Sequence, residues 1–319
     1  MDTHTTNQER KPLSIAEYAS ELTKNGTQVL QGAQGTFWVG YEAVAMVRIP
    51  TCHLAPPTPG EVQRVLWRGR VATVSYLLDP DEHHPANAWL YVCTDRAYAL
   101  DKLPHAMRKN VHRGLKELRI APISSDQLLA HGVQAFCDTR RRNGLSDGTS
   151  EEFYRRFSLR ARCPGHVILG AWKDDKLAAF LFITEVDDWA ENEGPFSVDT
   201  LLNLRPNDVL LFWELSHFLT KGACCVVSAG TSSIQAESNA AGLHAFKTKV
   251  GFEARPVHRV FMLHPLLRPF ANRLTLWGVN IALRFRPGDR RLKKAGGVLT
   301  YILEEKRMLL EAEEKRNDE

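Results

Sequence analysis

The order of helix and strand signals restarts after Pro122, and this repetition constrains the fold more than any other feature of the chain. Apolar spacing, capping residues and turn residues predict helix, helix, three strands, helix, strand, helix and strand in the second half. These segments are expected at Ser125 to Arg142, Ser150 to Arg162, Val167 to Trp172, Lys176 to Val186, Phe196 to Leu202, Val209 to Lys221, Cys224 to Ser228, Ala240 to Val250 and Val257 to Leu263. Strands interleaved with helices predict a mixed α/β (α+β) fold, with mixed central sheets flanked by helices.

The first half carries a weaker version of the same order. Ser14 and Glu17 form a capping-box pattern, which indicates that a helix begins there. The remaining segments are a helix at Leu13 to Lys24, strands at Phe37 to Val39, Glu42 to Ile49, Arg70 to Leu78 and Ala88 to Cys93, and a basic helix at Leu103 to Leu118. We therefore predict two related domains, 1–122 and 123–264, followed by a helical tail, 265–319.

Composition excludes several classes of protein. The chain has 319 residues, 44% of them apolar, and a net charge of +4, which excludes collagen, a disulfide scaffold and wholesale disorder. Met1 to Pro12 lacks the apolar stretch of a secretory signal, so a cytoplasmic protein is expected. The six cysteines form no C-x-x-C pair and are expected to be reduced thiols. The longest apolar stretch, Leu263 to Phe285, contains three arginines, so no transmembrane segment is predicted.

The tail is divided by charge. Between His264 and Gly297 there are eight basic residues and one acid, a net charge of +7, whereas Glu304 to Glu319 has a net charge of −3. Trp277, Ile281 and Phe285 are interleaved with the basic residues. This pattern favours two interpretations, an ordinary helix with a solvated basic side or a peripheral contact of 265–297 with an anionic membrane.

Several stretches resemble the FemAB-like proteins, which belong to the GNAT superfamily. The most specific is Gly242-Leu243-His244-Ala245-Phe246-Lys247-Thr248-Lys249-Val250-Gly251-Phe252, which is similar to an L-x-x-F-K-x-x-x-G signature near the end of their catalytic-type domain. The other stretches are Phe136 to Leu145, Pro206 to Trp213 followed by Lys221-Gly222, and the basic helix at Arg108 to Lys116. The matches extend from about Leu103 to Leu263.

The resemblance implies two tandem GNAT-like domains and an acyltransferase that acts on a small or carrier-linked amine. The donor it implies is acetyl-CoA or another acyl-CoA, or else aminoacyl-tRNA, as in enzymes that build peptidoglycan bridges. The loop that holds the pyrophosphate of acyl-CoA in GNAT proteins is rich in glycine, but Leu204 to Asp208 contains none. Arg205 and Asn207 stand where that loop would bind phosphate, beside the opposing carboxylate of Asp208.

The resemblance also places Lys247 near the phosphate or leaving group, and the backbone of Phe246 near the reacting centre. In helical spacing Leu243, Phe246, Lys247 and Val250 share one face, so Lys247 either extends to solvent or points into a cleft. Phe246 also fits plain core packing.

A general base must accept the proton of the attacking amine. The candidates are Glu185, Asp199 and Glu214, and we select Asp199 because a carboxylate in the middle of a predicted strand requires a partner or a cleft. Arg142 can clamp a phosphate or carboxylate, or can favour the end of its helix.

Arg108 and Lys109 belong to a basic helical face that suits tRNA phosphates or simply solvent. The acidic and histidine-containing loop Asp79 to His84 lacks the spacing of a known metal site, so no metal is predicted. A second class of function stays open, a non-catalytic protein of this fold that docks on a membrane or a partner.

Overall fold

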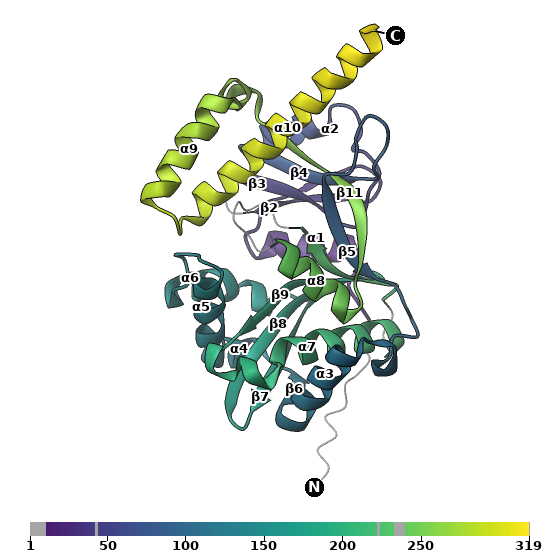
Figure 1. The fold of residues 1–319 in the computed structure, drawn as a ribbon, viewed down its shortest axis with the longest axis vertical. Coiled ribbons are helices and arrows are strands. Elements are labelled where there is room, and N and C mark those ends of the chain that lie inside the picture. The colour runs from purple at the N-terminus through teal and green to yellow at the C-terminus, as the bar shows by residue number, and fades with distance from the viewer. Residues whose placement is uncertain (1–10, 42–43, 222–223, 233–239, 319) are drawn as a thin grey trace.

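The computed structural model describes residues 11–41, 44–221, 224–232 and 240–318 (Figure 1). Before Pro122 the elements are α1 (Ile15–Lys24), β1 (Val29–Gln31), β2 (Phe37–Tyr41), β3 (Ala45–Ile49), α2 (Glu61–Gly69), β4 (Thr73–Leu78), β5 (Ala88–Cys93), the 3-10 turn η1 (Leu100–Lys102), α3 (His105–Glu117) and β6 (Arg119–Pro122). The capping box of Ser14 and Glu17 is present at the start of α1, as predicted.

The second half continues with α4 (Ser125–His131), α5 (Val133–Arg142), α6 (Ser150–Phe157), the 3-10 turn η2 (Arg160–Arg162), β7 (His166–Lys173), β8 (Lys176–Val186), β9 (Trp189–Ser197), the 3-10 helix η3 (Asp199–Leu204), α7 (Pro206–Leu215), the π-helical η4 (Ser216–Lys221), β10 (Val226–Thr231), α8 (Ala240–Val250) and β11 (Glu253–Leu263). The tail forms η5 (Pro265–Phe270), α9 (Arg273–Phe285) and α10 (Arg290–Asp318). The mixed α/β fold and the helical tail that the sequence predicted are confirmed.

The described strands join into one sheet, in the order β1-β2-β3-β4-β11-β5-β10-β9-β8-β7-β6. Strand β11 holds the two parts of the sheet together. Its residues Glu253 to Val257 pair with β5, and its residues His258 to Leu263 pair with β4. A single strand is therefore shared by the two parts of the sheet, which we call the first unit (β1 to β4) and the second unit (β5 to β10) (Figure 1).

Alternation along β7 and β8 divides the core of the second unit into two layers. Leu169, Leu181 and Ile183 face the main core, which also contains buried residues of α3, α7 and η4. Ile168, Phe180 and Phe182 face a second core beneath α4, α5 and α6. Successive side chains of a strand point to opposite faces, so this alternation buries the strands on both sides.

Two of the differences from the sequence prediction concern Asp199 and the domain boundary. The strand expected at Phe196 to Leu202 ends at Ser197, and Asp199 begins η3. The predicted domain boundary at Pro122 also does not divide the core. Strand β5 and helix α3 precede Pro122, but their residues Tyr91, Met107 and Val111 belong to the main core of the second unit. Spatial pairing with β10 and β11 determines where β5 belongs. Residues 1–10, 42–43, 222–223 and 319, for which the sequence also suggested features, lie outside the described residues.

Candidate functional site

The candidate site lies where the neighbouring strands β9 and β10 separate. They are parallel and pair from Trp189 to Glu191 on β9 and from Val226 to Ser228 on β10. The parallel ladder ends at the Glu191 and Ser228 pair. From there β9 continues along β8, and β10 continues along β5. Glu191 and Ser228 therefore lie at a fork in the sheet.

Lys247 reaches this fork from α8. Its Nζ donates a hydrogen bond of 2.6 Å to the carbonyl oxygen of Ala229 and lies 4.2 Å from the centre of the Tyr91 ring. Lys247 is only 9% exposed, so it does not extend into solvent. Burial lowers the pKa of Lys247 to about 8, although the charge of Glu191 acts in the opposite direction.

Glu191 supplies the opposite charge. Its carboxylate accepts hydrogen bonds from the hydroxyls of Thr51 and Ser228. Burial nevertheless raises the pKa of Glu191 to about 7, aided by the like charge of Glu193. Among the described residues, a Cβ atom built on Gly230 would meet only the Glu191 Oε1, at 3.9 Å, so this oxygen lies beside the glycine.

Two further groups complete the surroundings of the fork. The Tyr91 hydroxyl lies 3.1 Å from the Nδ1 of His244, which fixes the tyrosine ring beneath the Lys247 ammonium. Arg259 on β11 donates to the Thr231 hydroxyl over 3.0 Å, but its buried Nε has no partner among the described residues. The fork thus combines a carboxylate, an ammonium and a guanidinium.

The predicted pair of Arg142 and Asp199 lies elsewhere. These two side chains bind each other, and Arg142 also donates to the carbonyl and hydroxyl oxygens of Ser197. Ser197 is six positions beyond Glu191 on β9, which is roughly 20 Å at about 3.3 Å per residue. The structural reason for selecting Asp199 is therefore wrong. Arg142 holds η3 against the end of β9, and neither residue reaches the Lys247 site.

Four other predicted residues lie where α3 packs on the start of α7. Arg205 is the exposed N-cap of α7 with a φ of 63°, and Lys109 is exposed on α3. The Arg108 Nε and the Asn207 Oδ1 are buried and have no partner among the described residues. The structure therefore brings Arg108, Lys109, Arg205 and Asn207 to one region, apart from the fork.

The start of α7 does not fit the pyrophosphate of acyl-CoA. Asp208 is 6% exposed in the first turn and accepts a hydrogen bond of 2.8 Å from Asn110 of α3. Gly114 of α3 is so close that an added Cβ would lie 3.1 Å from the carbonyl oxygen of Leu204. A carboxylate and a packed helix therefore occupy the place where phosphate oxygens would need backbone amides.

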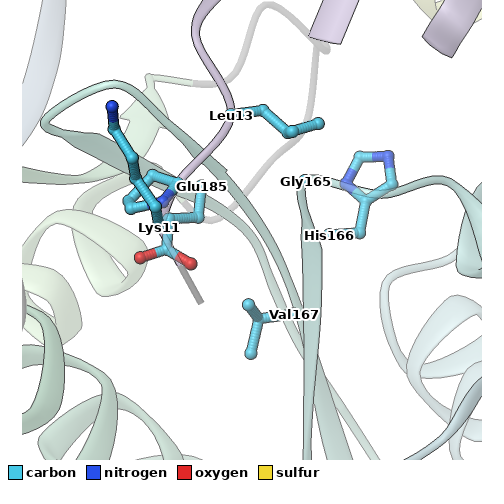
Figure 2. A pocket seen from close by; sticks show the side chains of 7 residues that line it. Lys11, Leu13, Gly165, His166, Val167 and Glu185 are labelled. Atoms are coloured by element: carbon cyan, nitrogen blue, oxygen red, sulfur yellow. The ribbon is translucent and has the colours of Figure 1, made fainter. Parts of the chain in front are cut away.

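The two other candidate bases have different surroundings. Glu214 is fully buried on α7 and accepts hydrogen bonds of 2.8 and 3.1 Å from Asn192, and burial raises its pKa to about 8. Glu185 lines a small pocket with Lys11, Leu13 and Val167. Figure 2 shows the imidazole of His166 turned away from the Glu185 carboxylate. Neither carboxylate belongs to the group around Lys247.

Phe246 is half-buried and packs against the main core, which is the packing role considered for it. In the part of the chain that the structure describes, no cluster of three metal-ligating side chains occurs.

Sequence reasoning missed Glu191 and Arg259. The run Glu191-Asn192-Glu193-Gly194 has the composition of a turn, although it forms the middle of β9. In the sequence, only the preceding apolar pair, Trp189 and Ala190, indicates that a strand begins there.

No family model and no curated protein matches this chain. Among solved structures, FemX is similar with a TM-score of 0.52 and 8% identity, over 83% of this chain and 95% of FemX. The C-terminal DUF2156 domain of a protein from Agrobacterium fabrum, named as a lysylphosphatidylglycerol synthetase, is similar with a TM-score of 0.50 and 17% identity, over 77% of this chain and 92% of that domain. The chain therefore shares the fold of FemX and of this DUF2156 domain.

Proposed function

Starting from this FemAB-like fold, we propose that the chain is an acyltransferase that moves an acyl group from an activated donor to an amine. The observation that carries the proposal is that the Lys247 ammonium binds the Ala229 carbonyl and the Glu191 carboxylate binds the Ser228 hydroxyl, so that both charges lie at the fork between β9 and β10. A half-buried base and a buried cation beside one another suit acyl transfer to an amine, which needs a proton acceptor and a positive charge near the reacting carbonyl.

The chemistry follows from these two groups. The amine nitrogen attacks the donor's carbonyl carbon, and the π electron pair of the carbonyl moves to its oxygen. Glu191 accepts the proton that the nitrogen must lose, through the Oε1 that borders Gly230. The Lys247 ammonium stabilises the negative charge on the oxygen or on the departing group. When the carbonyl re-forms, the leaving group departs with its electron pair and takes up the proton that Glu191 received from the amine.

The donor that we propose is an aminoacyl ester of tRNA. The first turn of α7 does not fit acyl-CoA, whereas Lys109 and Arg205 are exposed cations at the same end of the fold and suit a phosphate backbone. Lys249 on α8 lies near enough to act on the pKa of Asp208, which indicates that basic groups extend from this region toward α8. A thioester donor held in another way is the alternative.

The decisive experiment follows a labelled acyl group from charged tRNA in one arm and from acetyl-CoA in the other, onto a panel of amines. Glu191→Gln and Lys247→Met are each expected to slow transfer by about 10²-fold or more, since a positioned base or charge contributes that much. Lys176→Met, an exposed lysine on β8, is the matched control and should transfer at the normal rate.

Each outcome bears on a separate claim. Transfer from acetyl-CoA alone would overturn the tRNA donor and leave the acyltransferase standing. Full activity in folded Lys247→Met would remove Lys247 from the mechanism. No transfer in either arm would favour a non-catalytic docking protein, whose specific support is the exposed tail described next.

A further inference from the structure

The tail exposes a row of large apolar side chains. Leu266, Phe270, Leu274, Trp277 and Phe285 are each 61% or more exposed, and we refer to these five residues as the apolar stripe. Figure 1 shows α9, which carries three of them, at the edge of the molecule with α10 beside it. Folded proteins rarely leave so many large apolar side chains together in water without a use for them.

The stripe follows from the helical spacing of α9. Leu274, Trp277, Ile281 and Phe285 are three or four residues apart, so they lie along one face of the helix. Leu276 and Val279 face the other way and pack against a small core with Leu299 and Ile302 of α10. The helix is therefore held to the protein by one apolar face and presents a second one outward.

Arginines border the stripe. Arg273 and Arg284 adjoin Trp277 at helical spacing, and Arg268 and Arg286 flank the two ends; all four are exposed. The acid in this stretch, Asp289, is used locally, because its Oδ1 accepts hydrogen bonds from the backbone of Arg291 and Leu292. An outward apolar face with aromatic residues and a rim of arginines is typical of a helix that lies in the interface of an anionic membrane.

We propose that η5 and α9 form an interfacial arm that docks this protein on an anionic lipid surface, with the apolar stripe in the acyl boundary and the arginines on the headgroups. In the described residues no helix is long and apolar enough to cross a bilayer. A second copy of the chain fits less well, because its stripe would bring like-charged arginines face to face.

The test is vesicle co-sedimentation of the full chain with phosphatidylcholine vesicles, with and without phosphatidylglycerol. Binding is expected to need phosphatidylglycerol and to weaken as salt rises. The Leu274→Ser and Phe285→Ser double variant is expected to bind at least about tenfold more weakly, because two large side chains no longer enter the lipid. The Arg273→Gln and Arg284→Gln double variant should also bind more weakly, and its residual binding should depend less on salt.

The matched control is the Leu115→Ser and Leu159→Ser double variant, which removes two exposed leucines outside the tail. It is expected to bind like the unmodified protein. Equal binding by the stripe variant and the control would overturn the proposal. The proposal would also be overturned if light scattering without lipid showed a concentration-dependent dimer that the stripe variant no longer forms. The stripe would then be covered by a second copy of the chain. Thermal unfolding confirms that each variant is folded.

Discussion

Lys247 and Glu191 show how burial and pairing act together on two opposite charges. Burial lowers the pKa of the lysine to about 8 and raises that of the glutamate to about 7, while each partner's charge resists the change. The charged forms of both groups therefore coexist only in a narrow interval around those two values.

This interval predicts a bell-shaped pH dependence of transfer. Below about 7 Glu191 holds a proton and accepts no other, so the rate falls with decreasing pH. Above about 8 Lys247 loses its positive charge, so the rate falls with increasing pH. Single-turnover rates across this range measure both limbs. Lys247→Arg should move the alkaline limb upward, since a guanidinium stays protonated, and an unmoved limb would contradict the role of Lys247.

At this scale Lys247 could be predicted and its partner could not. A lysine on an apolar helical stripe is visible in the sequence at Phe246, Lys247 and Val250. Glu191 becomes significant only through the parallel pairing of β9 with β10, which places it beside Ser228. No local pattern encodes a pairing between residues that are 37 positions apart in the chain, as Glu191 and Ser228 are.

Among the elements, α3 and α7 approach each other most closely at Gly114. A Cβ there would lie 2.1 Å from the Val209 Cγ2 and 3.1 Å from the carbonyl oxygen of Leu204. Because the backbone of η3 cannot yield as easily as a side chain, Gly114→Ala should lower the free energy of unfolding by about 1–3 kcal/mol.

Gly278→Ala on α9 is the matched control, since a Cβ there meets nothing within 4 Å. It should raise the free energy of unfolding by about 0.5–1 kcal/mol through helix propensity alone. Urea denaturation measures both changes. Gains of the same size in the two variants would show that α3 and α7 are not in close contact at Gly114.

Element prediction succeeded where one face of a segment is apolar and its ends are marked. Lys176 to Val186 and Ala240 to Val250 match β8 and α8 to the residue. It failed at Asp199, because Phe196 to Val198 looks like a strand in isolation and the bond from Arg142 that holds Asp199 in η3 comes from a distant helix. Helix α2 was also missed beside its proline-rich loop.

At the scale of the whole molecule, β11 predicts that the two units unfold together. A chain that ends after Leu263 keeps the sheet and should show one cooperative thermal transition, whereas a chain that ends after Phe252 lacks β11 and should lose it. Circular dichroism on heating measures this difference. If the shorter chain kept a cooperative transition, the units that contain β4 and β5 would fold without β11 between them.

The position of β11 also governs when the sheet can form during synthesis. Strands β4 and β5 leave the ribosome long before Glu253 to Leu263 is made, and until then each has an edge without its neighbour. Open strand edges on a nascent chain invite pairing with other chains. The chain therefore passes most of its translation in a state that a holding chaperone must shield, and its yield in a cell depends on how quickly the last strand emerges.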